Sequence, residues 1–235
     1  MELREAIVLV TGGGTGIGLE TARLLKQHGA RVAICGRRRD VLESAAREID
    51  ALPIAGDVSD EDDAARIVGD VVREFGDYNT LVNNAGWGRF APLLDLDLAL
   101  FRSIMETNVF GAMLMARESA RHFVGRKRGN IVNVSSTAGS RGFAGGTAYV
   151  ASKFALGGMT ECWRAELRTH DVRVMQVNPS EVLTDFAGTA GYSQRERARK
   201  LRSVEIAHAI AAMLAMDDRG FTTELTVFAT NPEGP

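Results

Sequence analysis

The chain has 235 residues, of which 45% are hydrophobic and 25% charged, and its formal net charge at pH 7 is −2. This length and composition suit one globular domain with a substantial core. The near-neutral charge offers no electrostatic basis for binding nucleic acid or a membrane surface, so neither partner is expected.

The first residues, MELREAIVLVTGG, lack the basic start, long apolar segment and cleavage site of a signal peptide. No uninterrupted apolar run reaches membrane-spanning length. Cys35 and Cys162 lie in apolar stretches and are expected to be buried free thiols. Together these features predict a cytoplasmic protein.

Short apolar strands alternate with helices along the chain. The predicted strands cover residues 6–10, 31–35, 52–55, 80–82, 130–134, 172–177 and 224–228. The predicted helices cover residues 19–28, 40–49, 61–75, 98–123, 148–170 and 204–216. This alternation predicts an α/β fold whose parallel sheet is doubly wound, with helices on both faces. Since no long linker or repeat appears, residues 1–235 are predicted to form a single domain.

A glycine-rich loop, TGGGTGIG over residues 11–18, joins the first predicted strand to the first helix. Such a loop lets the backbone approach a pyrophosphate, and the helix N-terminus adds amide donors and a positive dipole end. The alternative is a tight turn that needs glycine and binds nothing. The strand–loop–helix context favours a cofactor phosphate. The candidate residues are Thr11, Gly12, Gly14, Thr15, Gly16, Ile17 and Gly18.

Arginines follow the second predicted strand, at the point where an acidic residue would bind the ribose 2′-hydroxyl of NAD. Arginine instead pairs with the 2′-phosphate of NADP. Arg37 is the first candidate for this contact and Arg38 the second, so NADP(H) is favoured over NAD(H). The alternative is a solvated basic start to a helix. After the third strand, Asp57 and Val58 are placed to meet the adenine.

Tyr149 and Lys153 form a Y-x-x-x-K pair at the start of a predicted helix. The i,i+4 spacing puts both side chains on one helix face, about 5–6 Å apart at Cβ. A free tyrosine has a pKa of about 10, too high for acid–base work at neutral pH. An ammonium about 4 Å away contributes about 4 kcal/mol at an effective dielectric of about 20, or about three pKa units in favour of tyrosinate. The alternative is an ordinary exposed helix pair.

Two further polar residues accompany this pair. Ser136 follows the predicted strand 130–134, and a hydroxyl at the carboxyl end of a central strand faces the crevice where such sheets bind ligands. Ser136 can therefore hydrogen-bond the carbonyl oxygen that Tyr149 protonates. Asn108 lies inside a predicted helix against its local propensity, which indicates a buried polar role.

The combination of TGGGTGIG at 11–18, DV at 57–58, NNAG at 83–86, Asn108, Ser136 and YVASK at 149–153 resembles the short-chain dehydrogenase/reductase family. The resemblance implies a seven-stranded Rossmann fold with strand order 3-2-1-4-5-6-7 and a catalytic tetrad of Asn108, Ser136, Tyr149 and Lys153. In that family the tyrosine transfers the proton, and the lysine lowers its pKa and holds the nicotinamide ribose. The serine orients the substrate, and the asparagine anchors a relay water. A homodimer or homotetramer through the predicted helices 98–123 and 148–170 is also implied.

The resemblance extends the cofactor site beyond the glycine loop. It implies that Asn84, Ala85 and Gly86 line the cleft beside the adenosine ribose. Pro179, Val182 and Thr184 match the family pattern P-G-x-V-x-T, which implies contacts to the nicotinamide carboxamide. Ser180 replaces the glycine of that pattern and is expected to restrict the backbone there.

The predicted activity is hydride transfer between NADP(H) and a carbonyl or secondary alcohol, with a 3-oxoacyl thioester as the leading substrate. Candidate substrate-pocket residues are Ser136, Thr137, Trp87, Phe90, Phe143, Phe186 and Tyr192, and residues 185–202 form the predicted substrate lid. Basic residues at 126–128 and 195–202 could meet an acyl carrier protein or a CoA phosphate, although such runs are usually solvated surface. The alternatives are a general carbonyl or sugar-alcohol dehydrogenase and a non-catalytic NADP-binding regulatory protein. No metal-ligand spacing appears.

Overall fold

A computed structural model describes residues 1–184, 186–191 and 199–231. Seven strands form one parallel sheet in the order β3-β2-β1-β4-β5-β6-β9. The strands are β1 (Ile7–Thr11), β2 (Arg31–Gly36), β3 (Leu52–Ala55), β4 (Thr80–Asn83), β5 (Gly129–Val134), β6 (Val172–Pro179) and β9 (Glu224–Val227). The predicted doubly wound sheet and its strand order are confirmed, with β9 as the seventh strand.

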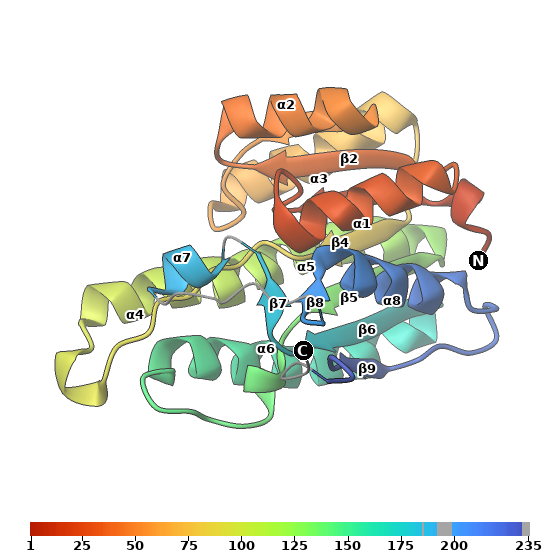
Figure 1. Cartoon of the computed structure of the whole chain (residues 1–235). Helices are drawn as coiled ribbons and strands as arrows, with labels where there is room; N and C mark the ends of the chain where they lie inside the picture. The colour runs from red at the N-terminus through yellow and green to blue at the C-terminus, as the bar shows by residue number, and fades with distance from the viewer. Residues whose placement is uncertain (185, 192–198, 232–235) are drawn as a thin grey trace.

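Helices cover both faces of the sheet (Figure 1). On one face lie α1 (Gly16–Gln27), α2 (Arg39–Ile49) and α8 (Ser203–Ala215), and on the other lie α3 (Glu61–Phe75), α5 (Ala112–Arg126) and α6 (Thr147–Leu167). Each face has its own buried apolar core, one around Leu25 and Ile34 and the other around Leu81 and Phe123. This two-sided burial explains why the central strands are almost continuously apolar.

The elements begin and end close to the predicted boundaries, with two informative differences. Helix α1 begins at Gly16, within the glycine loop, rather than at residue 19. Strand β6 continues to Pro179 because β9 pairs alongside it as far as the contact between Pro179 and Val227. Both differences extend regular structure toward the carboxyl edge of the sheet.

The predicted helix 98–123 is interrupted in the middle. Helix α4 (Leu98–Met105) passes into a π-helical segment, Glu106–Gly111, before α5 begins. Such π-bulges often mark functional sites, and this one contains Asn108. By length and hydropathy the whole helix Leu98–Arg126 could cross a membrane, but 44% of its most apolar window is buried inside the fold. Packing against α3 and α6 therefore accounts for much of its apolar character.

Several short elements were not predicted, because their few residues carry no periodic signal. They include the 3₁₀ helix Thr137–Gly139, the helix α7 (Phe186–Ala190), and a two-stranded ladder of β7 (Val182–Leu183) and β8 (Leu201–Arg202). Helix α7 and β8 belong to the predicted lid at 185–202; residues 185 and 192–198 of that segment lie outside the described residues.

The two cysteines differ in their surroundings. Cys35 in β2 is a buried free thiol, as predicted, and burial raises its pKa to about 12. The prediction of burial is wrong for Cys162, which lies on an exposed position of α6. Residues that are adjacent in a helix project from different faces, so the apolar residues next to Cys162 in the sequence do not cover its side chain.

Candidate active site

One cleft of about 530 Å³ lies at the carboxyl edge of the sheet, between the loops that follow β1, β2, β3 and β4. This is the edge where ligands of doubly wound sheets bind. Most of the predicted cofactor residues line it. They are Gly12, Gly14, Thr15, Gly16, Ile17, Arg37, Arg38, Asp57, Val58, Asn84, Ala85, Gly86, Tyr149, Lys153 and Thr184. The predicted substrate residues Trp87 and Phe186 line the same cleft.

The glycine loop has the backbone that the phosphate hypothesis requires. Gly12 and Gly16 have φ values of +64° and +57°, a region that favours glycine. A Cβ on Gly18 would lie 2.4 Å from the carbonyl oxygen of Gly12, so Gly18 permits the close packing of loop and helix. The loop thus leaves room for a pyrophosphate beside the N-terminus of α1.

Thr11 and Gly18 lie behind the cleft and outside its lining. The Thr11 hydroxyl accepts hydrogen bonds from the backbone N–H groups of Asn84 and Ala85, each at 2.9 Å. The Asn84 side-chain amide donates to the carbonyl oxygen of Thr11 at 2.8 Å. The hydrogen bonds between Thr11 and Asn84 therefore fix the segment after β4 against the glycine loop.

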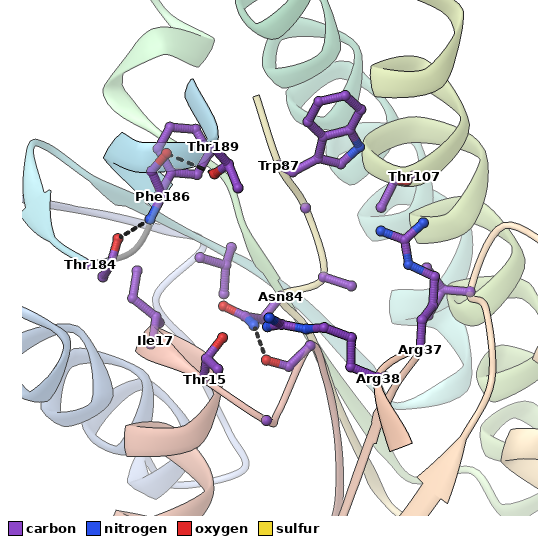
Figure 2. A pocket seen from close by; sticks show the side chains of 18 of the residues that line it. Thr15, Ile17, Arg37, Arg38, Asn84, Trp87, Thr107, Thr184, Phe186 and Thr189 are labelled. Atoms are coloured by element: carbon purple, nitrogen blue, oxygen red, sulfur yellow. Dashed lines mark hydrogen bonds between the residues drawn. The ribbon is translucent and has the colours of Figure 1, made fainter. Parts of the chain in front are cut away.

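Basic side chains occupy one end of the cleft. Figure 2 shows Arg37 and Arg38 at one side of the pocket, with Thr184, Phe186 and Thr189 at the opposite side. Arg37 is 63% exposed, and its Nη1 lies 3.7 Å from Oδ2 of Asp57. Asp57 is itself held by Ser59, whose N–H and hydroxyl donate to Oδ1 at 3.0 and 2.7 Å. This end of the cleft therefore carries two guanidinium groups and one carboxylate.

Tyr149 and Lys153 lie at the start of α6 and line the cleft together with the glycine loop. Lys153 is 6% exposed, and its Nζ donates to the carbonyl oxygen of Val134, at the end of β5, at 2.9 Å. Nζ also lies 5.7 Å from the centre of the Tyr149 ring. Burial lowers the pKa of Lys153 to about 8, because the charged form loses hydration. Since this pKa is still above 7, most of Lys153 is charged at neutral pH, and a cation lies near the Tyr149 ring.

Asn108 joins α6 to the segment after β4. It is 1% exposed, as its unusual position in a helix suggested. Its Oδ1 accepts from the N–H of Trp87 at 2.9 Å, and its Nδ2 donates to the carbonyl oxygen of Trp87 at 2.8 Å and to Oγ of Ser152 at 3.0 Å. Ser152 in turn donates to the carbonyl oxygen of Tyr149 at 2.7 Å. Asn108 contacts Ser152, a residue that the sequence analysis did not single out.

Ser136 lies two residues beyond the end of β5. Its Oγ accepts a hydrogen bond from the N–H of Ala138 at 3.1 Å and caps the 3₁₀ helix Thr137–Gly139. The neighbouring Ser135, rather than Ser136, lines the cleft. Also outside the lining are the predicted residues Thr137, Phe90, Phe143, Asn108, Pro179 and Val182.

The replacement of the family's glycine by Ser180 leaves no strain in the backbone. The non-glycine residues with positive φ in the described part of the chain are Asp50, Lys127 and Asp171. The N–H of Ser180 donates to the carbonyl oxygen of Val227 at 2.9 Å. The backbone at Ser180 is therefore held by an ordinary hydrogen bond to β9, and the serine side chain imposes no strained conformation on it.

Aromatic rings surround Tyr149. Its ring centre lies 5.2 Å from that of Phe186 and 6.0 Å from that of Phe90, and Phe143 meets Phe90 edge-on at 5.0 Å. Phe143 is 45% exposed and marks the outer rim of this group. The remaining aromatic candidate, Tyr192, lies outside the described residues.

Several lining residues were missed by sequence reasoning. They are Gly36, Val41, Leu42, Gly56, Thr107, Val134, Ser135 and Thr189. Half of them, Gly36, Gly56, Thr107 and Ser135, are adjacent to a residue that was predicted. Val41 and Leu42 are apolar positions of α2 that resemble any other core residue in sequence.

Comparison with known proteins gives the same family that the motifs resemble. The family model for short chain dehydrogenases matches residues 6–195. "Dehydrogenase/reductase SDR family member 7B" from Bos taurus is 30% identical over 196 residues, which cover 79% of this chain and 60% of that protein. The chain therefore spans about three fifths of that relative's length.

Other similar proteins match this chain over nearly its whole length. The "NADP-dependent 3-hydroxy acid dehydrogenase" of Schizosaccharomyces pombe is 29% identical over 97% of this chain and 93% of its own. A crystal structure of "3-ketoacyl-(acyl-carrier-protein) reductase" from Brucella melitensis, complexed with NADH, has a TM-score of 0.91 at 29% identity, covering 97% of this chain and 98% of that one. The chain belongs to the short-chain dehydrogenase family.

Proposed function

We propose that this protein interconverts a carbonyl compound and the corresponding alcohol, with NADP(H) as its cofactor. The observation that carries this proposal is the single cleft that joins the glycine loop and Arg37 at one end to Tyr149 and Lys153 at the other. A dinucleotide that is bound along this cleft has its phosphates at the loop and its nicotinamide toward the phenol.

When it is bound, the nicotinamide supplies or accepts the hydride. In the reductive direction Tyr149 donates its phenolic proton to the carbonyl oxygen, and solvent returns a proton to the phenolate afterwards. Lys153 stabilises that phenolate, since an opposite charge nearby favours the ionised form. Ser136 orients the carbonyl by donating a hydrogen bond to its oxygen. Asn108 holds the segment at Trp87 against α6 and so keeps the distances among these groups fixed.

Preference for NADP(H) over NAD(H) rests on the adenosine end. Arg37 and Arg38 line the cleft, whereas the family's NAD enzymes are expected to carry a carboxylate there. A guanidinium pairs with phosphate through parallel hydrogen bonds. The name of the Schizosaccharomyces pombe relative supports NADP, while the Brucella melitensis structure holds NADH.

A 3-oxoacyl thioester is the substrate that we propose within this class. The names of the two proteins that match nearly the whole chain support it, because each describes an acid or acyl group oxidised at carbon 3. The aromatic group around Tyr149 supports an apolar substituent beside the carbonyl.

Not all of the basic residues favour a carrier protein or CoA. Arg126 pairs with Asp77 and Arg128 with Glu5, at the amino edge of the sheet and away from the cleft. Lys200 pairs with Glu181 at 2.6 Å. Arg199 and Arg202, in the described part of the predicted lid, remain candidates for contact with an anionic carrier. The predicted Arg195 and Arg197 lie outside the described residues.

We further propose a homodimer or homotetramer that forms through α5 and α6, and a cytoplasmic location. Phe154 is 47% exposed on α6, and Phe110 is 46% exposed in the π-helical segment that leads into α5. A groove of about 490 Å³ lies between α5 and α6. It is lined by Met113, Ala116, Arg117, Ala120, Arg121, Val124, Trp163, Glu166 and Leu167. Exposed aromatic side chains beside an apolar groove are typical of subunit interfaces.

The experiment that tests the function is an NADPH-oxidation screen over acetoacetyl-CoA, ethyl acetoacetate, 2,3-butanedione, benzaldehyde and a keto-sugar, repeated with NADH. We expect acetoacetyl-CoA to give the largest kcat/KM and NADPH to be preferred. A faster keto-sugar would replace the proposed substrate and keep the reaction class. No oxidation of either cofactor above the substrate-free rate would contradict the enzymatic function.

A further inference from the structure

Gly88 occupies a place beside Tyr149 where no side chain fits. It lies in the loop after β4 and is buried. A Cβ there would lie 2.8 Å from Cδ2 and 3.2 Å from Cγ of Tyr149, and 2.9 Å from Cζ of Phe186. Its φ lies outside the left-handed region, unlike that of Gly12 or Gly16. The requirement for glycine at position 88 is therefore one of space rather than of backbone conformation.

The backbone around Gly88 is anchored and cannot easily move aside. Trp87 makes two backbone hydrogen bonds with the side chain of Asn108, at 2.9 and 2.8 Å. The N–H of Phe90 donates to the carbonyl oxygen of Ala190, in α7, at 3.1 Å, and the N–H of Ala91 donates to that of Gly145 at 2.9 Å. These contacts tie residues 87–91 to three different parts of the fold. An added side chain at position 88 would instead displace the rings that it meets.

We propose that Gly88 is a positioning residue for the reaction. Because it has no side chain, the rings of Tyr149 and Phe186 can both pack against its backbone, and this packing fixes the position of the phenol and of the first residue of α7. The inference rests on the proposed function, in which Tyr149 is the proton donor. Tyr149 comes from α6 and Phe186 from α7, which begins two residues after Thr184. The N–H of Phe186 donates to Oγ1 of Thr184 at 3.3 Å (Figure 2).

The effect of Gly88→Ala should fall on the chemical step rather than on cofactor binding. Gly88 is absent from the lining of the cofactor cleft, although its neighbour Trp87 belongs to it. A displaced phenol is misaligned with the substrate oxygen, and a misplacement of about 1 Å can lower a rate by about a hundredfold. We expect the displaced phenol to lie farther from Nζ of Lys153, and because a more distant cation favours the phenolate less, the pKa of Tyr149 should rise.

A second variant separates the two rings. Phe186→Leu shortens the side chain whose Cζ lies 2.9 Å from the added Cβ and so gives that methyl group room on one side. If Gly88 acts through this shared space, Phe186→Leu should cost less activity in the Gly88→Ala background than in the wild type. Such coupling between neighbouring residues is what a double-mutant cycle measures.

The test uses the full chain with NADPH and acetoacetyl-CoA, and with ethyl acetoacetate as a second probe. Gly142→Ala is the matched control, because nothing lies within 4 Å of a Cβ at that position and its φ is not positive. We expect Gly88→Ala to lower kcat about a hundredfold, to leave the Kd for NADPH within about twofold, and to move the alkaline pH–rate midpoint upward. Tyrosinate absorbance, with Tyr149→Phe subtracted, should show the same upward movement without any substrate.

Two results would overturn the proposal. One is a Gly88→Ala enzyme whose kcat and tyrosinate titration match those of Gly142→Ala. The other is equal loss of NADPH affinity and kcat with no rescue by Phe186→Leu, which would mean that the whole site is disordered. If instead Tyr149→Phe keeps full turnover, the proposed function fails first, and this outcome is distinct from both.

Discussion

The two ends of the cleft are built differently. At the adenosine end, Arg37 is 63% exposed and meets Asp57 through a single contact of 3.7 Å. At the phenol end, Asn108 and Lys153 are 1% and 6% exposed, and fixed hydrogen bonds hold both. In the proposed function, cofactor choice therefore rests on solvated side chains, whereas the residues that support the proton donor Tyr149 are buried. An exposed charge contributes little to the free energy of unfolding, so replacing it changes that free energy little. A buried ammonium group, by contrast, lowers the free energy of unfolding.

The largest effect that distinguishes the two ends is expected for Lys153→Met. Turnover should fall about 10²–10⁴-fold, the usual worth of general acid–base catalysis. The apoprotein should become more stable at pH 7, by up to about 3 kcal/mol, because a charged group with a depressed pKa is removed. Urea denaturation of both proteins measures this difference.

The same lysine gives the wild type a pH-dependent stability. Its pKa is about 8 in the folded protein and 10.5 ordinarily, so the unfolded chain binds more protons between these values. Wild-type stability relative to Lys153→Met should therefore rise as pH increases from about 8 to 10.5. If Lys153→Met is less stable than the wild type at pH 7, and if the stability difference does not change between pH 8 and 10.5, then burial does not destabilise the charged form of Lys153.

Asn108→Ala tests the rigidity of the phenol end. The change removes the partner of the part-buried backbone N–H and C=O of Trp87 and one of the two hydrogen bonds of the Ser152 hydroxyl, which costs about 2–3 kcal/mol of unfolding free energy. Ser59→Ala is the matched change at the adenosine end, where it removes bonds to Asp57. We expect its cost to be below about 1 kcal/mol because water can replace the hydroxyl. Equal losses in thermal denaturation would abolish the contrast between the ends.

Arg37→Ala should have the smallest effect on the fold and a selective effect on the cofactor. We expect the KM for NADPH to rise about 10- to 30-fold, the worth of a hydrogen bond between charged groups, while the KM for NADH stays within about twofold. Arg39→Ala, a similarly exposed change beside it that removes only a pair with Glu43, serves as the control. Parallel losses for both cofactors would argue against recognition of a 2′-phosphate.

Much of this fold could be predicted because the sheet is buried on both sides. Alternating apolar strands and amphipathic helices identify every strand of the main sheet and the helices that cover it. The π-helical segment at Asn108 was not predicted, since its residues continue the apolar pattern of α4 and α5 and only the buried asparagine indicates it. The short β7, α7 and β8 were missed because two to five residues have no period.

The sequence indicates a candidate site residue where only one residue type can do the chemistry. It gives no sign of a residue that matters only through its position in the fold. The glycine loop, Arg37, Tyr149 and Lys153 have few chemical alternatives, and the structure places them on one cleft. Ser152 and Gly88 are ordinary in sequence. Ser152 has an oxygen 3.0 Å from Nδ2 of Asn108, and Gly88 leaves the space beside Tyr149 that a Cβ would fill. Both contacts join segments that are distant in the sequence, so neither could be predicted from it.

The central claim is that a phenol beside a buried ammonium transfers the proton in a cleft that also holds NADPH. Tyr149→Phe tests it most directly, because the substitution removes one oxygen and preserves the ring that packs on Phe186 and Phe90. The account predicts an NADPH Kd within about twofold of the wild type and a turnover that is about 10²–10⁴-fold lower at every pH. Turnover of acetoacetyl-CoA by Tyr149→Phe at the wild-type rate, with NADPH bound equally well, would contradict it.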